Sequence, residues 1–153
     1  MGFQAVVLNT ETMAITEYGN FRFNSFCEFA GKVLAAGPNG LFSLEGTDDA
    51  GTPIVASFQT ALTDFGSSNL KQVLDVIADF GGAGIEIETV TDGGVVAADQ
   101  TVISTADGIR TERIKPGRGI KSRALGFNVC NVNGGDLDLK DLEMRMAILG
   151  RKL

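Results

Sequence analysis

The sequence predicts an all-β protein folded as an antiparallel β-sandwich of the jelly-roll-like type. Glycine gives the first indication, because 20 of the 153 residues are glycine, against a usual share of about 7%. These glycines gather in polar clusters roughly 8–18 residues apart, a spacing typical of turns between short strands. Alternation of apolar and polar residues between the clusters gives the second indication, since it provides a strand with one buried face. The length suits one domain, and we expect a single sandwich over residues 1–153.

The expected strands of the first half are short. Residues 21–25 alternate, with two phenylalanines and a serine on one face and polar residues on the other. Residues 41–44 and 53–58 follow as two strands joined through the turn at 47–52. Pro53 opens its strand, where the missing backbone N–H costs least.

The strands expected in the second half are more regular. Residues 85–89 place two isoleucines and a threonine on one face, opposite Glu86 and Glu88. Residues 125–131 carry apolar side chains and an asparagine along one face, and residues 142–148 give a closing strand after a glycine-rich turn. We expect one face of each strand to point into the core and the other to face solvent.

Residues 68–80 fit two interpretations. The apolar side chains that fall at helical spacing, behind Ser68 as a helix cap and before Gly81 as a stop, are Leu70, Val73, Leu74, Ile77 and Ala78. The side chains that would share one face of a strand are Leu70, Leu74, Val76, Ala78 and Phe80. Periodicity does not decide between a short helix and a strand over so short a segment.

The net charge of −6 conceals an uneven distribution. Residues 1–109 hold 14 acidic and 3 basic side chains, a net charge of −11, whereas residues 124–153 hold four of each. Between them, residues 110–123 hold six basic side chains and one acidic one, a net charge of +5. The six basic side chains are Arg110, Arg113, Lys115, Arg118, Lys121 and Arg123.

We consider three roles for this basic block. A nucleic-acid site would use its charge but would also want aromatic side chains for stacking, and the first aromatic residue after the block is Phe127. A solvated loop is the second role. A contact with an acidic neighbouring subunit is the third and favoured one, because arginine pairs carboxylates bidentately. The six basic residues are therefore our candidate partner interface, and we do not expect nucleic-acid binding.

The residues that commonly carry catalysis or hold metals are sparse. The chain contains no histidine, which excludes a Ser-His-Asp triad and imidazole metal ligands. Cys27 and Cys130 form no Cys-x-x-Cys motif, so we expect two small buried thiols, with a disulfide or a reactive thiol as the alternatives.

Carboxylate pairs occur at Asp48-Asp49, Glu86/Glu88 and Asp136/Asp138. Adjacent pairs do not indicate the spaced acids of a glycosidase, and residues 47–51 lack the full spacing of a calcium loop. A hydrogen-bonded turn is the favoured interpretation there. We expect no enzyme activity, no cofactor, no metal and no small-molecule substrate.

The sequence also gives no indication of membrane insertion. The apolar stretch 3–8 has no positive residue before it, unlike a signal peptide, and the longest uncharged stretch, 33–44, is too short to span a bilayer.

Several short segments carry a resemblance when they are taken in order, and they are residues 8–12, 16–18, 40–42, 46–51, 64–67, Lys71, 91–92, 117–123, Phe127, Asn131 and 135–139. Over roughly residues 8–151 the chain resembles virion structural proteins found in the tails and baseplates of tailed bacteriophages.

The resemblance implies a β-sandwich without enzymatic activity that serves as a repeated building block of a tail, tail tip or baseplate. It favours a strand over a helix at residues 70–80. It also implies a homo-oligomer in contact with other virion proteins, located in the virion and, during assembly, in the host cytoplasm. A carbohydrate- or receptor-binding module of a phage tail is the alternative, although the absence of tryptophan and the single tyrosine, Tyr18, argue against it.

Overall fold

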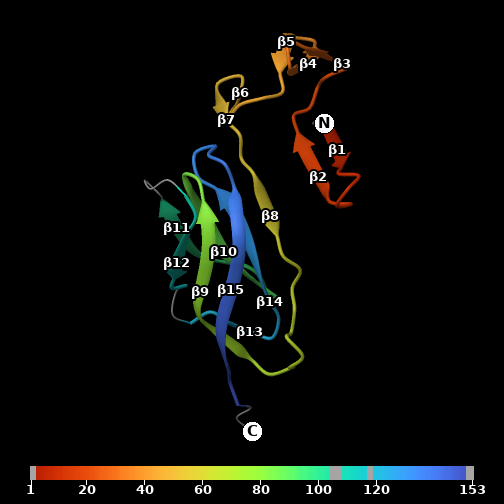
Figure 1. Ribbon diagram of the computed structural model, residues 1–153. Coiled ribbons are helices and arrows are strands. Elements are labelled where there is room, and N and C mark those ends of the chain that lie inside the picture. The colour runs from red at the N-terminus through yellow and green to blue at the C-terminus, as the bar shows by residue number, and fades with distance from the viewer. Residues whose placement is uncertain (1–2, 104–107, 117–118, 151–153) are drawn as a thin grey trace. The chain divides into compact units, whose positions relative to one another are not determined.

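The computed structural model describes residues 3–103, 108–116 and 119–150, and Figure 1 shows an all-β chain. The described residues contain no helix, and every strand pairing is antiparallel. The predicted all-β class is therefore confirmed. The sequence suggested one domain over residues 1–153, and the structure divides the chain into two compact units, Met1–Gly46 and Thr47–Leu153.

The first unit contains two small sheets. One is a hairpin of two strands, β1 (Gln4–Leu8) and β2 (Ile15–Gly19). The other orders its three strands β3-β4-β5, with bounds Ser25–Phe29, Lys32–Gly37 and Gly40–Ser43. The strand expected at 21–25 is wrong except at its last residue, because residues 21–24 lie outside any strand.

The second unit contains a short hairpin and two larger sheets. The hairpin pairs β6 (Asp48–Asp49) with β7 (Thr52–Pro53). One larger sheet has the order β11-β10-β14-β8, with bounds Gly94–Ile103, Gly84–Thr91, Leu125–Asn131 and Ser57–Gln59. In the other, β9 (Lys71–Gly81) pairs on one side with β15 (Asp138–Ile148) and on the other with β12 (Arg110–Ile114) and β13 (Lys121–Ser122).

The strand expected at 41–44 largely matches β5, but the one expected at 53–58 is wrong in its middle, because Pro53 ends β7, residues 54–56 lie outside any strand and β8 begins at Ser57. The two segments also do not pair with each other. β5 pairs with β4, whereas β8 pairs with β14. The turn between them therefore connects two different sheets, because pairing depends on partners far along the chain that the local pattern does not reveal.

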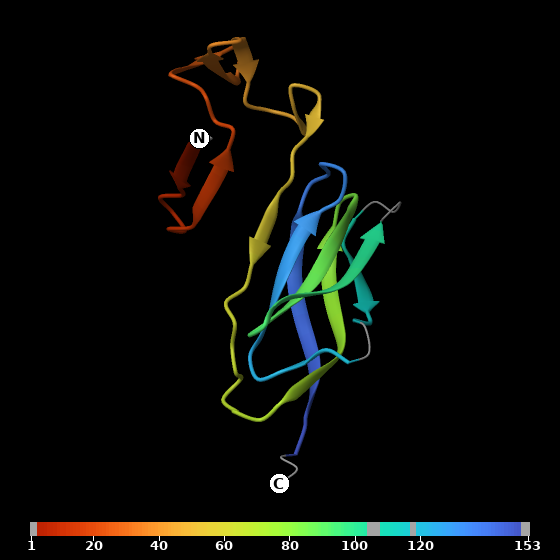
Figure 2. The ribbon, with the colours of Figure 1, turned by 180° about the vertical axis from the view of Figure 1, so that it is seen from behind.

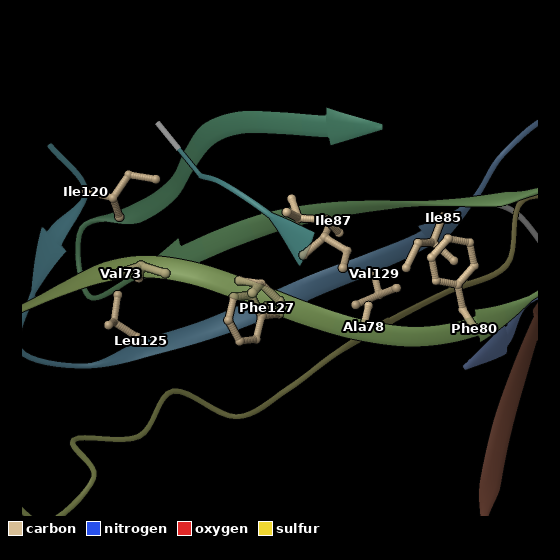
Figure 3. Packing of buried hydrophobic residues seen from close by; sticks show 11 residues of the cluster. Val73, Ala78, Phe80, Ile85, Ile87, Ile120, Leu125, Phe127 and Val129 are labelled. Carbon is tan, nitrogen blue, oxygen red and sulfur yellow. The ribbon is translucent and has the colours of Figure 1, made fainter. Parts of the chain in front are cut away.

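Both larger sheets contribute side chains to one buried cluster, seen in Figure 3. Its members are Val73, Val76, Ala78, Phe80, Ile85, Ile87, Ile114, Ile120, Leu125, Phe127 and Val129. The predicted inward faces of 85–89 and 125–131 are confirmed, since Ile85, Leu125 and Val129 are fully buried. Two layers meeting in one core are what a sandwich requires. The jelly-roll-like strand order stays a prediction.

Residues 71–81 form a strand, so the interpretation favoured by the resemblance is confirmed and the short helix is wrong. Its predicted inward face is confirmed at Val76, Ala78 and Phe80, which are buried, and is wrong at Leu70 and Leu74, which are exposed. Asp75 pairs with Arg145 but Val73 pairs with Met146, so Leu74 is an extra residue in β9. This β-bulge reverses the alternation: Val73 is buried, while Leu74 is 47% exposed.

The two cysteines are free, and the prediction that both are buried is wrong. Cys27 in β3 is exposed and Cys130 in β14 is partly exposed. Cys27 is exposed because every residue of β3 is exposed, so its sheet buries neither face of that strand.

Candidate functional site

The structure divides the predicted basic interface into side chains with different surroundings. Arg110 extends over the ring of Phe80, with its guanidinium carbon 4.5 Å from the ring centroid. Its side chain is only 20% exposed, and its Nε lies 3.7 Å from Glu112 Oε1. Such a cation–π contact holds the charge against the core. The Arg110 side chain thus interacts mainly with residues of its own sheet.

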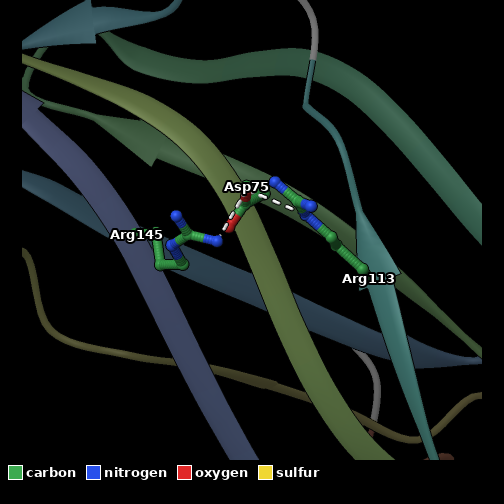
Figure 4. Close-up of polar contacts among 3 residues, drawn as sticks. All are labelled: Asp75, Arg113 and Arg145. Atoms are coloured by element: carbon green, nitrogen blue, oxygen red, sulfur yellow. Dashed lines mark hydrogen bonds and ion pairs between the residues drawn. The ribbon is translucent and has the colours of Figure 1, made fainter.

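Arg113 is engaged with Asp75 on the neighbouring strand β9 (Figure 4). Its Nε donates a hydrogen bond of 2.9 Å to Asp75 Oδ2, and its Nη2 donates to the same oxygen. Arg145, from β15 on the other side of β9, places Nη1 3.6 Å from that oxygen. The two side chains are 54% and 50% exposed and cover a carboxylate that is only 2% exposed. They therefore neutralise a buried acid and join three strands.

Neither Asp75 as the partner of Arg113 nor Arg145 as a second cation beside Asp75 was identified from the sequence. An acidic residue inside the apolar segment 73–78 was the available signal, since a buried carboxylate requires a donor or a cation.

Lys121 and Arg123 are exposed and line a pocket of about 560 Å³. The other residues that line it are Ser68, Asn69, Leu70, Leu149 and Gly150. No acidic residue is among these lining residues. Of the two remaining predicted cations, Lys115 is exposed and Arg118 lies outside the described residues. Of the six predicted residues, Lys121 and Arg123 thus share one basic pocket, and the partner interface itself stays a prediction.

A buried lysine organises the backbone around this pocket. Lys71 is fully buried, and its Nζ donates hydrogen bonds to the carbonyl oxygens of Asn69 at 3.0 Å and Arg123 at 2.7 Å, and to that of Ser67. All three acceptors are neutral carbonyls, so the ammonium charge stays uncompensated by these bonds. Lys71 links the loop before β9 to the residues after β13.

Asn131, the last residue of β14, also connects distant segments through its side-chain hydrogen bonds. Its Oδ1 accepts a hydrogen bond of 2.9 Å from the Ala56 N–H, while its Nδ2 donates to the carbonyls of Ile54 and Gly135, both at 2.8 Å. The side chain thereby ties the segment before β8 to the turn before β15. Asn131, Lys71 and Gly135 are among the residues that carry the resemblance, and all three take part in hydrogen bonds that connect distant segments.

The three carboxylate pairs lie in different settings. Asp48 Oδ1 accepts a hydrogen bond of 2.8 Å from the Gly51 N–H, which confirms the predicted hydrogen-bonded turn. Glu88 accepts one of 2.7 Å from Asn128 Nδ2. Asp138 forms an ion pair of 2.7 Å with Lys140. Within the described residues, no group of three or more cysteine or carboxylate side chains is placed to hold a metal ion.

Comparisons with known proteins give no family for this chain. No family model matches it, and neither does any curated protein or solved structure. The described part of the chain has no helix of a length and hydrophobicity suited to crossing a membrane.

Proposed function

We propose that the chain is a non-enzymatic structural component of a bacteriophage virion, in the tail, tail tip or baseplate. It works by self-association and by contacts with other virion proteins. The assignment to a virion is supported by the ordered sequence resemblance over roughly residues 8–151. The assignment to assembly is supported by a single structural observation, the exposed apolar surface of the first unit.

Twelve large apolar side chains of that unit are exposed, and Ala35 is its one buried apolar residue among those described. The exposed residues are Phe3, Val6, Val7, Leu8, Met13, Ile15, Tyr18, Phe26, Phe29, Val33, Leu41 and Leu44. Exposed apolar side chains in such number are typical of surfaces that bind other proteins. Strands with so little burial need a covering partner for their stability.

The β1–β2 hairpin shows why one face alone does not account for this exposure. Its register places Val6, Leu8 and Ile15 on one face, and Val7 and Tyr18 on the other. All five side chains are at least 44% exposed. A hairpin that is apolar on both faces is suited to insertion between two partner surfaces rather than to lying on one.

The first test is the composition of purified particles of the phage that encodes the chain. We expect quantitative mass spectrometry to find the chain at a fixed copy number and electron microscopy to locate it in the tail or baseplate. A chain absent from particles would contradict the virion assignment.

The second test concerns the apolar surface. The triple variant Val6→Ser, Leu8→Ser, Ile15→Ser removes one face of the hairpin, and we expect native mass spectrometry to show association weakened by at least about tenfold. The matched control is Val55→Ser, Leu62→Ser, Ile109→Ser, three exposed apolar residues of the second unit. Equal loss in both variants would contradict the role of the first unit.

Carbohydrate binding is a second candidate, favoured by one observation. Phe21 lies within 6 Å of three other aromatic rings, 4.9 Å from Phe23, 5.8 Å from Phe26 and 5.9 Å from Tyr18. Phe26 and Tyr18 are 55% and 48% exposed, so the group offers ring surface to a sugar. A glycan array that gives no binding would remove this candidate.

A further inference from the structure

The two ends of the second unit differ in charge. Figures 1 and 2 show the β6–β7 hairpin and the turn before β15 at one end of the β9–β15 ladder and β13 at the other. The register agrees, because β9 and β15 pair Gly81 with Asp138 at one end and Lys71 with Ile148 at the other.

The basic end is the pocket lined by Lys121 and Arg123. Along this segment the side chains alternate: Ser122 between them is buried and bonds to Asp92 Oδ1, while Lys121 and Arg123 are exposed. The buried ammonium of Lys71 donates to the Arg123 carbonyl at 2.7 Å. Two cations thus line a pocket whose described lining residues include no carboxylate, and the buried Lys71 bonds to the backbone of two of those residues, Asn69 and Arg123.

The acidic end consists of two turns that lie together. Residues 47–53 carry Asp48 and Asp49, residues 132–137 carry Asp136, and neither segment contains lysine or arginine. All three aspartates are exposed.

Close packing holds these two turns in place. A Cβ at Gly134 would lie 2.9 Å from both Pro53 Cβ and the Thr47 carbonyl oxygen, so only glycine allows the turns to approach so closely. Asn131 adds hydrogen bonds to Ile54 and Gly135. These contacts fix the conformation of the two turns before binding, so binding costs little conformational entropy there.

The acidic end of a chain is too far from its own pocket to enter it. The ten residues that separate the two ends of the ladder span about 33 Å at roughly 3.3 Å per residue. The charges are complementary, yet they meet only between two molecules.

We propose that the Lys121–Arg123 pocket receives the acidic end, Asp48, Asp49 and Asp136, of a second copy of this chain. This inference rests on the self-association in the proposed function and names the site that directs it. Because the two contact surfaces differ, a pair of copies keeps one pocket and one acidic end unoccupied, and the contact repeats head to tail into a ring or a filament.

The experiment uses the full chain and two reversed-charge variants. One is Lys121→Glu, Arg123→Glu. The other is Asp49→Lys, Asp136→Lys, which keeps Asp48 because its carboxylate holds the turn. We expect each variant alone to associate at least about tenfold more weakly than the wild type in sedimentation velocity. An equimolar mixture should regain association, because the unaltered acidic end of the first variant fits the unaltered pocket of the second.

The control is Lys32→Glu, Lys140→Glu, which lowers the net charge by the same amount as Lys121→Glu, Arg123→Glu and leaves the pocket intact. Circular dichroism verifies that each variant is folded, and recovery in the mixture shows it independently. Wild-type association should also weaken as NaCl rises from about 0.05 to about 0.5 M.

Three outcomes would count against this inference, and the first and third of them leave the proposed self-association standing. Wild-type oligomers that both reversed-charge variants retain overturn the head-to-tail contact and leave self-association standing. A wild type that remains monomeric at every concentration overturns both. Variants that associate weakly alone and show no recovery in the mixture also overturn the head-to-tail contact.

Discussion

The two units of the chain are both built from antiparallel strands, yet their apolar side chains lie in opposite environments. In residues 47–153, two sheets share a core in which Phe80, Ile85 and Val129 are 0% exposed. In residues 1–46, Phe29 and Ile15 are 71% and 68% exposed. Exposed apolar area costs about 25 cal/mol per Å². The difference shows that strands can pair without forming a core. It supports the proposal that another protein surface covers the first unit.

Truncating one phenylalanine in each unit tests this comparison with the largest expected effect. Phe80→Ala removes a ring from the shared core, and we expect it to lower the free energy of unfolding by about 3–5 kcal/mol. Phe29→Ala removes an equal ring that is 71% exposed, and we expect a change within about 0.5 kcal/mol. Urea denaturation followed by circular dichroism measures both. Similar losses would show that residues 1–46 have a core of their own.

A smaller effect should follow when the lysine that organises the pocket is replaced. Lys71→Met keeps the volume but leaves three carbonyls without their donor, and we expect the free energy of unfolding to fall by about 2–3 kcal/mol. Lys32→Met is the matched control in the first unit, where the Lys32 side chain is 62% exposed, with an expected change of less than about 0.5 kcal/mol. Urea midpoints that coincide for the two variants would argue against a structural role for Lys71.

The smallest effect concerns the two cysteines, one in each unit. Burial raises the pKa of the Cys130 thiol above its ordinary value of 9.0, and Glu88 and then Glu86 raise it further. Since the thiolate is the reactive form, Cys130 should be alkylated more slowly than the exposed Cys27 at pH 8. Glu88→Gln should speed the reaction at Cys130 and leave Cys27 unchanged, as measured by iodoacetamide labelling and mass spectrometry.

The same raised pKa has a consequence for stability. The folded chain holds the Cys130 proton more tightly than the unfolded chain does. Its contribution to stability is therefore fully present below the ordinary thiol pKa and is lost as pH rises through the raised one.

In the labelling experiment, equal alkylation rates at Cys27 and Cys130 would contradict the environment assigned to Cys130.

How far the sequence predicted the fold depends on the regularity of each strand. β10 and β14 alternate cleanly, and both inward faces were predicted correctly. The alternation fails in β9 because Leu74 is an extra residue, a bulge that depends on pairing with β15. The segment at 21–25 alternates equally well, yet residues 21–24 form no strand.

The candidate site was predicted less completely. The basic block was evident in the sequence as a cluster of positive residues. The sequence did not show that Arg113 donates a hydrogen bond to Asp75, 38 residues away. Arg110 extends over Phe80, which lies on the neighbouring strand. No local pattern reveals which cations a distant acid or ring engages.

The sequence by itself determined the all-β class, the inward faces of 85–89 and 125–131, and the hydrogen-bonded turn at Asp48. These depend on the alternation of side chains along a strand and on turn residues that bond to their own backbone, and both act within a few residues. Only the tertiary structure decided which strands share a sheet, which apolar residues gain a core, and that Lys121 and Arg123 line an open pocket. The physical reason is that burial and charge pairing depend on neighbours brought together from distant parts of the chain.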